Sequence, residues 1–455
     1  MKRMSFFIIV VMTLALAGCN RQGGSASGTQ TVKMAWTMAD QETVDPVTGI
    51  KNPSKVIMEN VVSKVTGYNI EITWLGSSNW IQQLETLTTS GEVDVARFTN
   101  QVMVPQWFDD LTPYIQKSTV LGNGGMEKLF SDYTLNYIPY HTFDIPEATG
   151  QIFGLPYELS QSCVSYDAEI FRQWGVEPPQ EGDSFEILLE KGRKVHGTNP
   201  VTGKQNYGMY IRADRTEFIA ISFDAWLAVR NNFDMNIRNF DKEKYVESIK
   251  TSSELLNYFN WLAAVVELCP PGITTNAGAE KWMTEDNDIA IHLHPSAYYT
   301  VFNYYKAKMD NITSRFKFIS YPVSSEGQQG FPEFDFLGIA KQSKIKDDAW
   351  KVVEAVVTTP EILDEIFLNF RYVGLPVLRD PSMLKYLKEP IPDTRRRIEV
   401  SFNTGFRTDD YWFFRTPIQP VIAEILAKTI TPENARAKQY EEVKKWVENK
   451  ERLAR

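Results

Sequence analysis

The alternation of strand and helix patterns over residues 31–98 is the feature that most constrains the fold of this chain. Three stretches have the short apolar or alternating patterns of strands, namely residues 31–37, 68–74 and 93–98. Between them, Asn52 and Pro53 begin a segment with apolar residues at helical spacing, and residues 81–87 form a shorter one that ends near a glycine. This alternation predicts the α/β class, in which helices cover a sheet.

The same patterns recur toward the C-terminus. Residues 316–321 and 336–340 predict short strands. Apolar residues at helical spacing over 349–357 predict an amphipathic helix, and Thr431 and Pro432 begin the last helix. With 455 residues, the chain is too long for one simple core, so we expect two lobes.

The N-terminus has the pattern of a secretory leader. Lys2 and Arg3 precede an apolar run over residues 6–16. That run is too short to span a bilayer comfortably, so it predicts a signal peptide over residues 1–18 that is removed from the mature protein. We therefore expect the protein to work outside the cytoplasm.

Residues 16–19, Leu-Ala-Gly-Cys, resemble the lipobox of bacterial lipoproteins. This resemblance implies cleavage before Cys19 and lipidation of its thiol, which would hold the protein on the extracytoplasmic face of the cell membrane. Residues 19–30 are rich in Gly and Ser and predict a flexible tether. The alternative is an ordinary secretory signal followed by an incidental cysteine.

Charge and composition exclude some classes of function. The net charge is −9, and the one dense basic run, residues 395–397, is flanked by acidic residues, so we expect no nucleic-acid partner. The 11 Trp and 20 Tyr favour recognition of a ligand with flat apolar faces. Cys163 and Cys269 could form a disulfide outside the cytoplasm or remain as two buried thiols, and the sequence leaves both open.

Several motifs together resemble the family-1 extracellular solute-binding proteins, the receptors of sugar-importing ABC transporters. They occur in the family's order over nearly the whole mature chain, at residues 151–157, 165–171, 174–179, 289–292, 336–344, 348–350 and 373–377. The stretch from Phe336 to Lys344 is the most specific of them. Three positions depart from the family pattern: residues 90–95 lack the usual proline, residues 294–298 lack the usual Gly-x-Trp, and Asp167 stands where Asn is common.

The resemblance implies a two-lobe, periplasmic-binding-protein-like (Venus-flytrap) fold whose chain crosses between the lobes several times. Lobe 1 is expected over residues 31–157 plus 295–345, and lobe 2 over 160–292 plus 346–455. It also implies a monomer that binds a sugar, closes its lobes around it and presents it to ABC transporter permease subunits. No cofactor and no catalytic activity are expected.

A sugar has hydroxyl groups around a flat C–H face, so its receptor needs aromatic platforms and polar side chains. Residues 407–412 look like a late loop over the cleft, and residues 157–161 lie at the first predicted crossing. The expected ligand-binding residues are Trp36, Asp40, Asn79, Trp80, Tyr157, Glu158, Gln161, Asp224, Trp226, Tyr298, Asp335, Arg407 and Trp412.

For several of these residues the sequence leaves a structural role open. Trp36, Trp80, Trp226 and Trp412 could equally pack inside a lobe, and Glu158 could be a solvated loop charge. The sequence alone does not separate these roles, because an aromatic residue suits a core as well as a sugar face.

Other functions also remain open. The same fold could bind a peptide, polyamine, metal complex or polyol, or the chain could be an adhesion lipoprotein with a vestigial cleft. A carbohydrate-active enzyme would need a carboxylate pair about 5–10 Å apart, which a sequence cannot show. His292 and His294 would point the same way on a strand, but no third metal ligand is evident, and a packed pair is the simpler interpretation.

Overall fold

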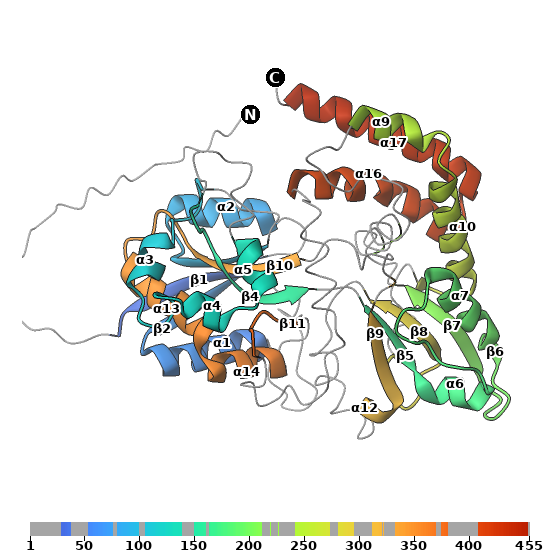
Figure 1. Ribbon diagram of the computed structural model, residues 1–455, viewed down its shortest axis with the longest axis horizontal. Helices are drawn as coiled ribbons and strands as arrows, with labels where there is room; N and C mark the ends of the chain where they lie inside the picture. The colour runs from blue at the N-terminus through green and yellow to red at the C-terminus, as the bar shows by residue number, and fades with distance from the viewer. Residues whose placement is uncertain are drawn as a thin grey trace, which may run out of the picture.

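The computed structural model forms two lobes, each built on its own sheet (Figure 1). The structure describes residues 29–37, 53–75, 80–99, 105–138, 150–160, 163–211, 219, 226, 242–273, 281–294, 312–320, 322, 333–369, 375–380 and 408–453.

Lobe 1 contains a six-stranded sheet in the order β11-β4-β10-β3-β1-β2. Its strands are β1 (Thr31–Thr37), β2 (Asn69–Leu75), β3 (Val95–Thr99), β4 (Leu155–Ser160), β10 (Glu333–Ile339) and β11 (Leu375–Pro376). Strand β1 pairs in parallel with β2 and β3, whereas β10 runs antiparallel to β3 and β4. The first three strands therefore point their carboxyl ends the same way, as the predicted strand–helix alternation requires.

Helices close the core of lobe 1. They are α1 (Pro53–Thr66), α2 (Trp80–Ser90), α3 (Thr112–Lys117), α4 (Gly125–Leu129), α5 (Asp132–Tyr137), α13 (Lys346–Thr358) and α14 (Pro360–Asn369). In α13, Ala349, Val352, Val353, Val356 and Val357 are all buried, which confirms the amphipathic helix that their spacing predicts.

Lobe 2 contains a five-stranded sheet in the order β6-β7-β8-β5-β9. Its strands are β5 (Cys163–Asp167), β6 (Gly197–Thr198), β7 (Gln205–Ile211), β8 (Ile289–His294) and β9 (Phe316–Ser320). Its helices are α6 (Ala168–Trp174), α7 (Phe185–Lys194), α9 (Lys242–Ile249), α10 (Ser253–Glu267), α12 (Ile312–Arg315), α16 (Thr408–Leu426) and α17 (Pro432–Leu453). Side-chain caps begin several of these helices: the Ser184 hydroxyl accepts from the Ile187 amide, and the Ser252 hydroxyl accepts from the Leu255 amide.

The predicted division into lobes differs from this arrangement at two places. Residues 295–345 were expected in lobe 1, but β9 pairs with β5 and belongs to lobe 2. Residues 346–455 were expected in lobe 2, but α13 and α14 pack in the core of lobe 1. Both crossings between the lobes therefore lie later in the chain than predicted. The first lies between β9 and β10, and the second lies between β11 and α16. Local sequence patterns do not show these positions, because the lobe of a segment is decided by long-range pairing and packing.

Cys269 is a free thiol at the end of α10, buried among apolar side chains, so it forms no disulfide. Its sulfhydryl donates to the Val265 carbonyl over 3.3 Å, and burial raises the pKa of the thiol to about 12. A thiol held neutral in this way reacts slowly. For Cys269 the structure therefore fits the alternative of a buried thiol and not that of a disulfide.

No helix in the described part of the chain is both long and apolar enough to cross a membrane.

The helix α17 carries a buried polar side chain whose replacement should stabilise the fold. Gln439 is fully buried, and within the described residues neither its amide nitrogen nor its amide oxygen has a hydrogen-bond partner. A buried unpaired amide is costly, so Gln439→Leu should raise the free energy of unfolding by about 1–3 kcal/mol. Urea unfolding measures this change. Gln342→Leu, at an exposed position, is the control and should have no comparable effect; a Gln439→Leu variant less stable than the wild type would contradict the prediction.

Candidate functional site

Topology brings one edge of each sheet together. In lobe 1, the parallel strands β1, β2 and β3 end at the edge where β4 ends and β10 begins. In lobe 2, β5 begins at the edge where β8 and β9 end, because Cys163 pairs with both His294 and Ser320. Two residues of chain join Ser160 to Cys163, so these two edges face each other, and Figure 1 shows β4 pointing toward β5. In open α/β sheets, ligands bind outside the carboxyl ends of strands.

Aromatic side chains line up across the lobe 1 sheet near this edge. Trp36 pairs in register with Trp74 on the neighbouring strand, and both precede the last residue of their strands. The Trp36 ring lies 5.5 Å from the ring of Tyr157, which comes from β4. Both Trp36 and Tyr157 are buried in the core of lobe 1, so the structural role left open for Trp36 applies in this structure.

Three charged side chains lie on the neighbouring strands β3, β10 and β4, near the same strand ends as these aromatic residues. Arg97 on β3 forms an ion pair with Asp335 on β10, and Asp335 pairs in register with Glu158 on β4. Glu158 is 1% exposed and Asp335 3% exposed, so Glu158 is not a solvated loop charge. The cluster holds one cation and two carboxylates inside the lobe, where charges interact strongly because little water screens them.

Proton affinities in the cluster reflect this environment. Burial alone would lower the pKa of the Arg97 guanidinium, but Asp335, Tyr157 and Glu158 more than offset that and raise it. Burial, followed by the charges of Glu158 and Asp335, raises the pKa of the Tyr157 hydroxyl well above its ordinary value. Arg97 therefore stays charged and Tyr157 stays neutral at any physiological pH. Perturbed groups of this kind gather at functional sites.

Arg97 was missed by the sequence-based prediction. The signal was present: an arginine inside the short apolar strand pattern of residues 93–98 must be buried with a partner. Its partner Asp335 was predicted as a ligand-binding residue, but nothing in the sequence places residues 238 positions apart on neighbouring strands.

Apart from Trp226, the predicted residues divide into three groups. The structure brings Trp36, Tyr157, Glu158 and Asp335 together in lobe 1, and Trp80 lies half-buried at the start of α2, after the end of β2. Trp412 lies in α16, which replaces the predicted loop at this position from Thr408 onward, and its side chain is outside the described residues. The rest also lie outside them: Asp40, Asn79, Gln161, Asp224, Tyr298, Arg407 and the lipidation site Cys19.

Trp226 belongs to the core of lobe 2. It is 2% exposed, and its ring lies 5.3 Å from Phe185, 5.6 Å from Trp261 and 5.8 Å from Tyr258. The expectation of a cleft aromatic at this position is therefore not met in this structure, because four large rings fill one another's space inside the lobe.

His292 is also a packed residue. Its ring lies 4.7 Å from Tyr210 and 5.1 Å from Trp282, and it is buried. Among the described residues, no group of three or more potential ligands could hold a metal ion.

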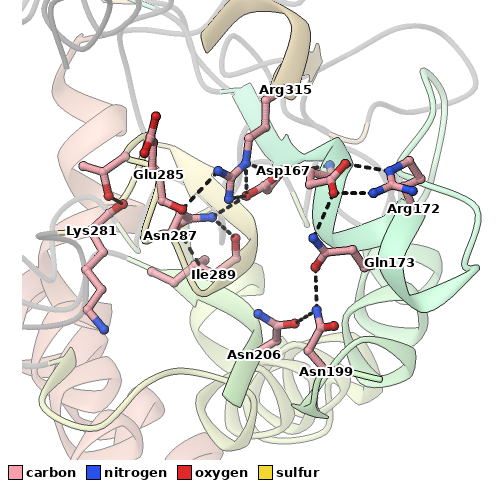
Figure 2. A network of polar contacts seen from close by, with 12 residues as sticks. Asp167, Arg172, Gln173, Asn199, Asn206, Lys281, Glu285, Asn287, Ile289 and Arg315 are labelled. Carbon is pink, nitrogen blue, oxygen red and sulfur yellow. Dashed lines mark hydrogen bonds and ion pairs between the residues drawn. The ribbon is translucent and has the colours of Figure 1, made fainter. Parts of the chain in front are cut away.

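A second polar network lies in lobe 2, at the end of β5 that points away from the facing edges (Figure 2). The Arg315 guanidinium donates to the Asp167 carboxylate through Nε and Nη2, and the Asn287 amide donates to the same carboxylate over 2.8 Å. Asp167 is fully buried and also caps α6 by accepting from the Glu169 amide. Asp167 lies at the end of β5 opposite to Cys163. It therefore stabilises lobe 2 and lies away from the strand ends that face lobe 1.

Two α/β lobes with facing strand edges define a two-lobe binding protein. Residues 54–361 match the bacterial extracellular solute-binding proteins, and the chain belongs to that family.

Solved structures share the fold at low sequence identity. An ABC substrate-binding protein from Listeria monocytogenes in complex with cycloalternan matches with a TM-score of 0.63 and 16% identity, covering 92% of this chain and 99% of its own. A solute-binding protein from Agrobacterium vitis with bound D-mannitol has a TM-score of 0.65 and 14% identity over the same shares. The GacH receptor of Streptomyces glaucescens, solved with acarbose, has a TM-score of 0.62 and 13% identity, covering 92% of this chain and 98% of its own. No curated protein matches the sequence.

Proposed function

We propose that this protein is a lipid-anchored extracytoplasmic receptor that binds a carbohydrate, with an oligosaccharide as the favoured form, and delivers it to an ABC importer. The observation that carries the proposal is that the strand ends of lobe 1, beside the Arg97–Asp335 ion pair, face the strand ends of lobe 2. Family membership supports the receptor class. The complexes of similar folds with cycloalternan, D-mannitol and acarbose support the carbohydrate class.

Closure of the lobes supplies the mechanism. A ligand between the two edges contacts both lobes only when they approach each other, so it binds the closed state more tightly and shifts the population toward it. The permease subunits then distinguish the closed, loaded receptor from the open one. In this role the receptor performs no catalysis and acts as a monomer.

Thermal unfolding against a ligand panel tests the receptor function. The panel contains mono- and oligosaccharides, polyols, amino acids, polyamines and metal ions. A specific ligand at 100 times its dissociation constant should stabilise the fold by about 2.7 kcal/mol, which shifts the unfolding midpoint clearly. A shift with one class of saccharide supports the proposal. A shift only with charged ligands, or none across the panel, would contradict it.

The anchor has a separate test. Cells that express the wild type with labelled palmitate should incorporate label into the protein and retain it in the membrane fraction, because several acyl chains bind a bilayer durably. Cys19→Ser should remove the label and release the protein from the membrane fraction. Equal membrane retention of both proteins would contradict lipidation at Cys19.

A further inference from the structure

Two neighbouring strands of lobe 1 lead directly into lobe 2. Strand β4 ends at Ser160 and β5 begins at Cys163, and β10 begins at Glu333 after β9 of lobe 2. The two strands pair with each other up to these ends, because Ser160 pairs with Glu333. The β4–β10 pair therefore carries two of the connections between the lobes, and a rotation of one lobe against the other acts on it.

The pairing of β4 with β10 is irregular at one place. Asp335 of β10 pairs with Glu158 of β4. The next residue of β10, Phe336, pairs with Pro156, which leaves Tyr157 as an extra residue in β4. An extra residue of this kind is a β-bulge, which disrupts the ladder and bends the strand, and a proline has no amide hydrogen to strengthen it. The β4–β10 pair is therefore weakest at Tyr157, where its part inside lobe 1 meets the part that leads toward lobe 2.

One ion pair crosses this weak place from β3. The Arg97 guanidinium binds the carboxylate of Asp335, which is the first residue of β10 on the lobe 2 side of the bulge. The side chains of Arg97 and Asp335 are 13% and 4% exposed, so water screens their attraction little. Arg97 stays charged at any physiological pH, because arginine does not lose its proton in proteins. The ion pair therefore ties the outgoing part of β10 to β3, which belongs to the lobe 1 sheet.

We propose that the Arg97–Asp335 ion pair fixes the bend of the β4–β10 pair at the Tyr157 bulge and thereby limits the lobe orientations that the free protein adopts. The inference rests on the proposed receptor function and adds the residues that control closure. Arg97 and Asp335 are then positioning residues, which act on affinity through the strands and not through a contact with the ligand. Loss of the ion pair makes the orientation that closes around a ligand rarer, and the apparent affinity falls in the same proportion.

Distances between the lobes in the free protein test the inference without a ligand. Spin labels are attached through an encoded ketone amino acid at position 64 of α1 in lobe 1 and position 257 of α10 in lobe 2, both of which are exposed. Double electron–electron resonance then measures the distribution of distances between the two labels. In Arg97→Met, which removes the charge and keeps a long side chain, this distribution should become about twofold wider, because several lobe orientations replace one.

A second ion pair supplies the matched control. Lys191 and Asp183 in lobe 2 are each 13% exposed, like Arg97, but neither lies on a strand that connects the lobes. Lys191→Met should therefore leave the distribution of distances as in the wild type. Asp335→Asn is the second test variant, since it removes the same ion pair with little change in shape. Circular dichroism shows which variants are folded.

Affinity is the second readout. Isothermal titration calorimetry uses maltotriose, cellotriose and mannotriose as the probes. For any of them that binds the wild type, Arg97→Met and Asp335→Asn should each raise the dissociation constant by about tenfold if the closing orientation becomes about tenfold rarer. Lys191→Met should leave the dissociation constant unchanged.

The outcomes separate the inference from the proposed function. If folded Arg97→Met and Asp335→Asn keep the wild-type distribution of distances, or if Lys191→Met widens it as much, the inference is wrong and the receptor function stands. A wider distribution with unchanged affinity for a trisaccharide that binds the wild type also refutes the inference. If no saccharide binds the wild type, the carbohydrate function is wrong, and the distances in the free protein still decide whether the ion pair limits the lobe orientations.

Discussion

Asp167→Ala should lower the free energy of unfolding by about 3–5 kcal/mol, because it leaves the Arg315 guanidinium in lobe 2 without its carboxylate. The Arg315 side chain is 14% exposed, so water can compensate only part of the loss. The same substitution removes the acceptor of the Asn287 amide and the cap of α6. Urea unfolding monitored by tryptophan fluorescence measures the change.

The neighbouring ion pair on α6 is a matched control. Arg172 and Glu169 also form a charge-assisted pair, but Arg172 is 70% exposed, and exposed pairs contribute little. Arg172→Ala should therefore leave the unfolding midpoint close to that of the wild type. Asp167→Asn keeps an acceptor for the α6 cap and should cost less than Asp167→Ala. Equal stability of Asp167→Ala and Arg172→Ala would show that the buried network does not hold lobe 2 together.

Trp226→Ala should also lower the free energy of unfolding by about 3–5 kcal/mol, because it empties the centre of an aromatic cluster. The rings of Phe185, Tyr258 and Trp261 are all within 5.8 Å of the Trp226 ring, so the cavity cannot collapse without moving them. Chemical unfolding gives the stability of the variant, and calorimetry at a temperature where it is folded gives its affinity for the ligand.

The affinity measurement distinguishes the two roles of Trp226. A core residue changes stability and leaves the dissociation constant within about threefold, whereas a stacking platform loses about tenfold or more in affinity with a small change in stability. Trp80→Ala is the comparison, since Trp80 is half-buried at the start of α2, beyond the end of β2. A large loss of affinity in folded Trp226→Ala would return this residue to the ligand site.

Local patterns were sufficient for elements whose period appears in the sequence. The spacing of apolar residues in α13 predicts its buried face, and the alternation in β2 appears in its burial, where Ile70 and Ile72 are buried and Glu71 and Thr73 exposed. These features follow from the geometry of a helix or strand, which repeats every 3.6 or 2 residues whatever lies around it.

Long-range pairing decided what local patterns could not. The strand patterns of β9 and β10 both appear in the sequence, but only hydrogen-bonded pairing assigns β9 to β5 and β10 to β3 and β4. The same applies to the candidate site. The sequence singles out Tyr157, Glu158 and Asp335 by residue type and by resemblance, and only the register of three strands joins Asp335 to Arg97.

By itself, then, the sequence determined the α/β class, the family resemblance and the residue types suited to a sugar site, because these depend on local order along the chain. The tertiary structure alone decided in which lobe β9, α13 and α14 lie, which tryptophans are enclosed in a core, and how one arginine and two carboxylates form a buried cluster. The physical reason is that burial and ion pairing depend on distances between segments that are far apart in the chain, and folding sets those distances.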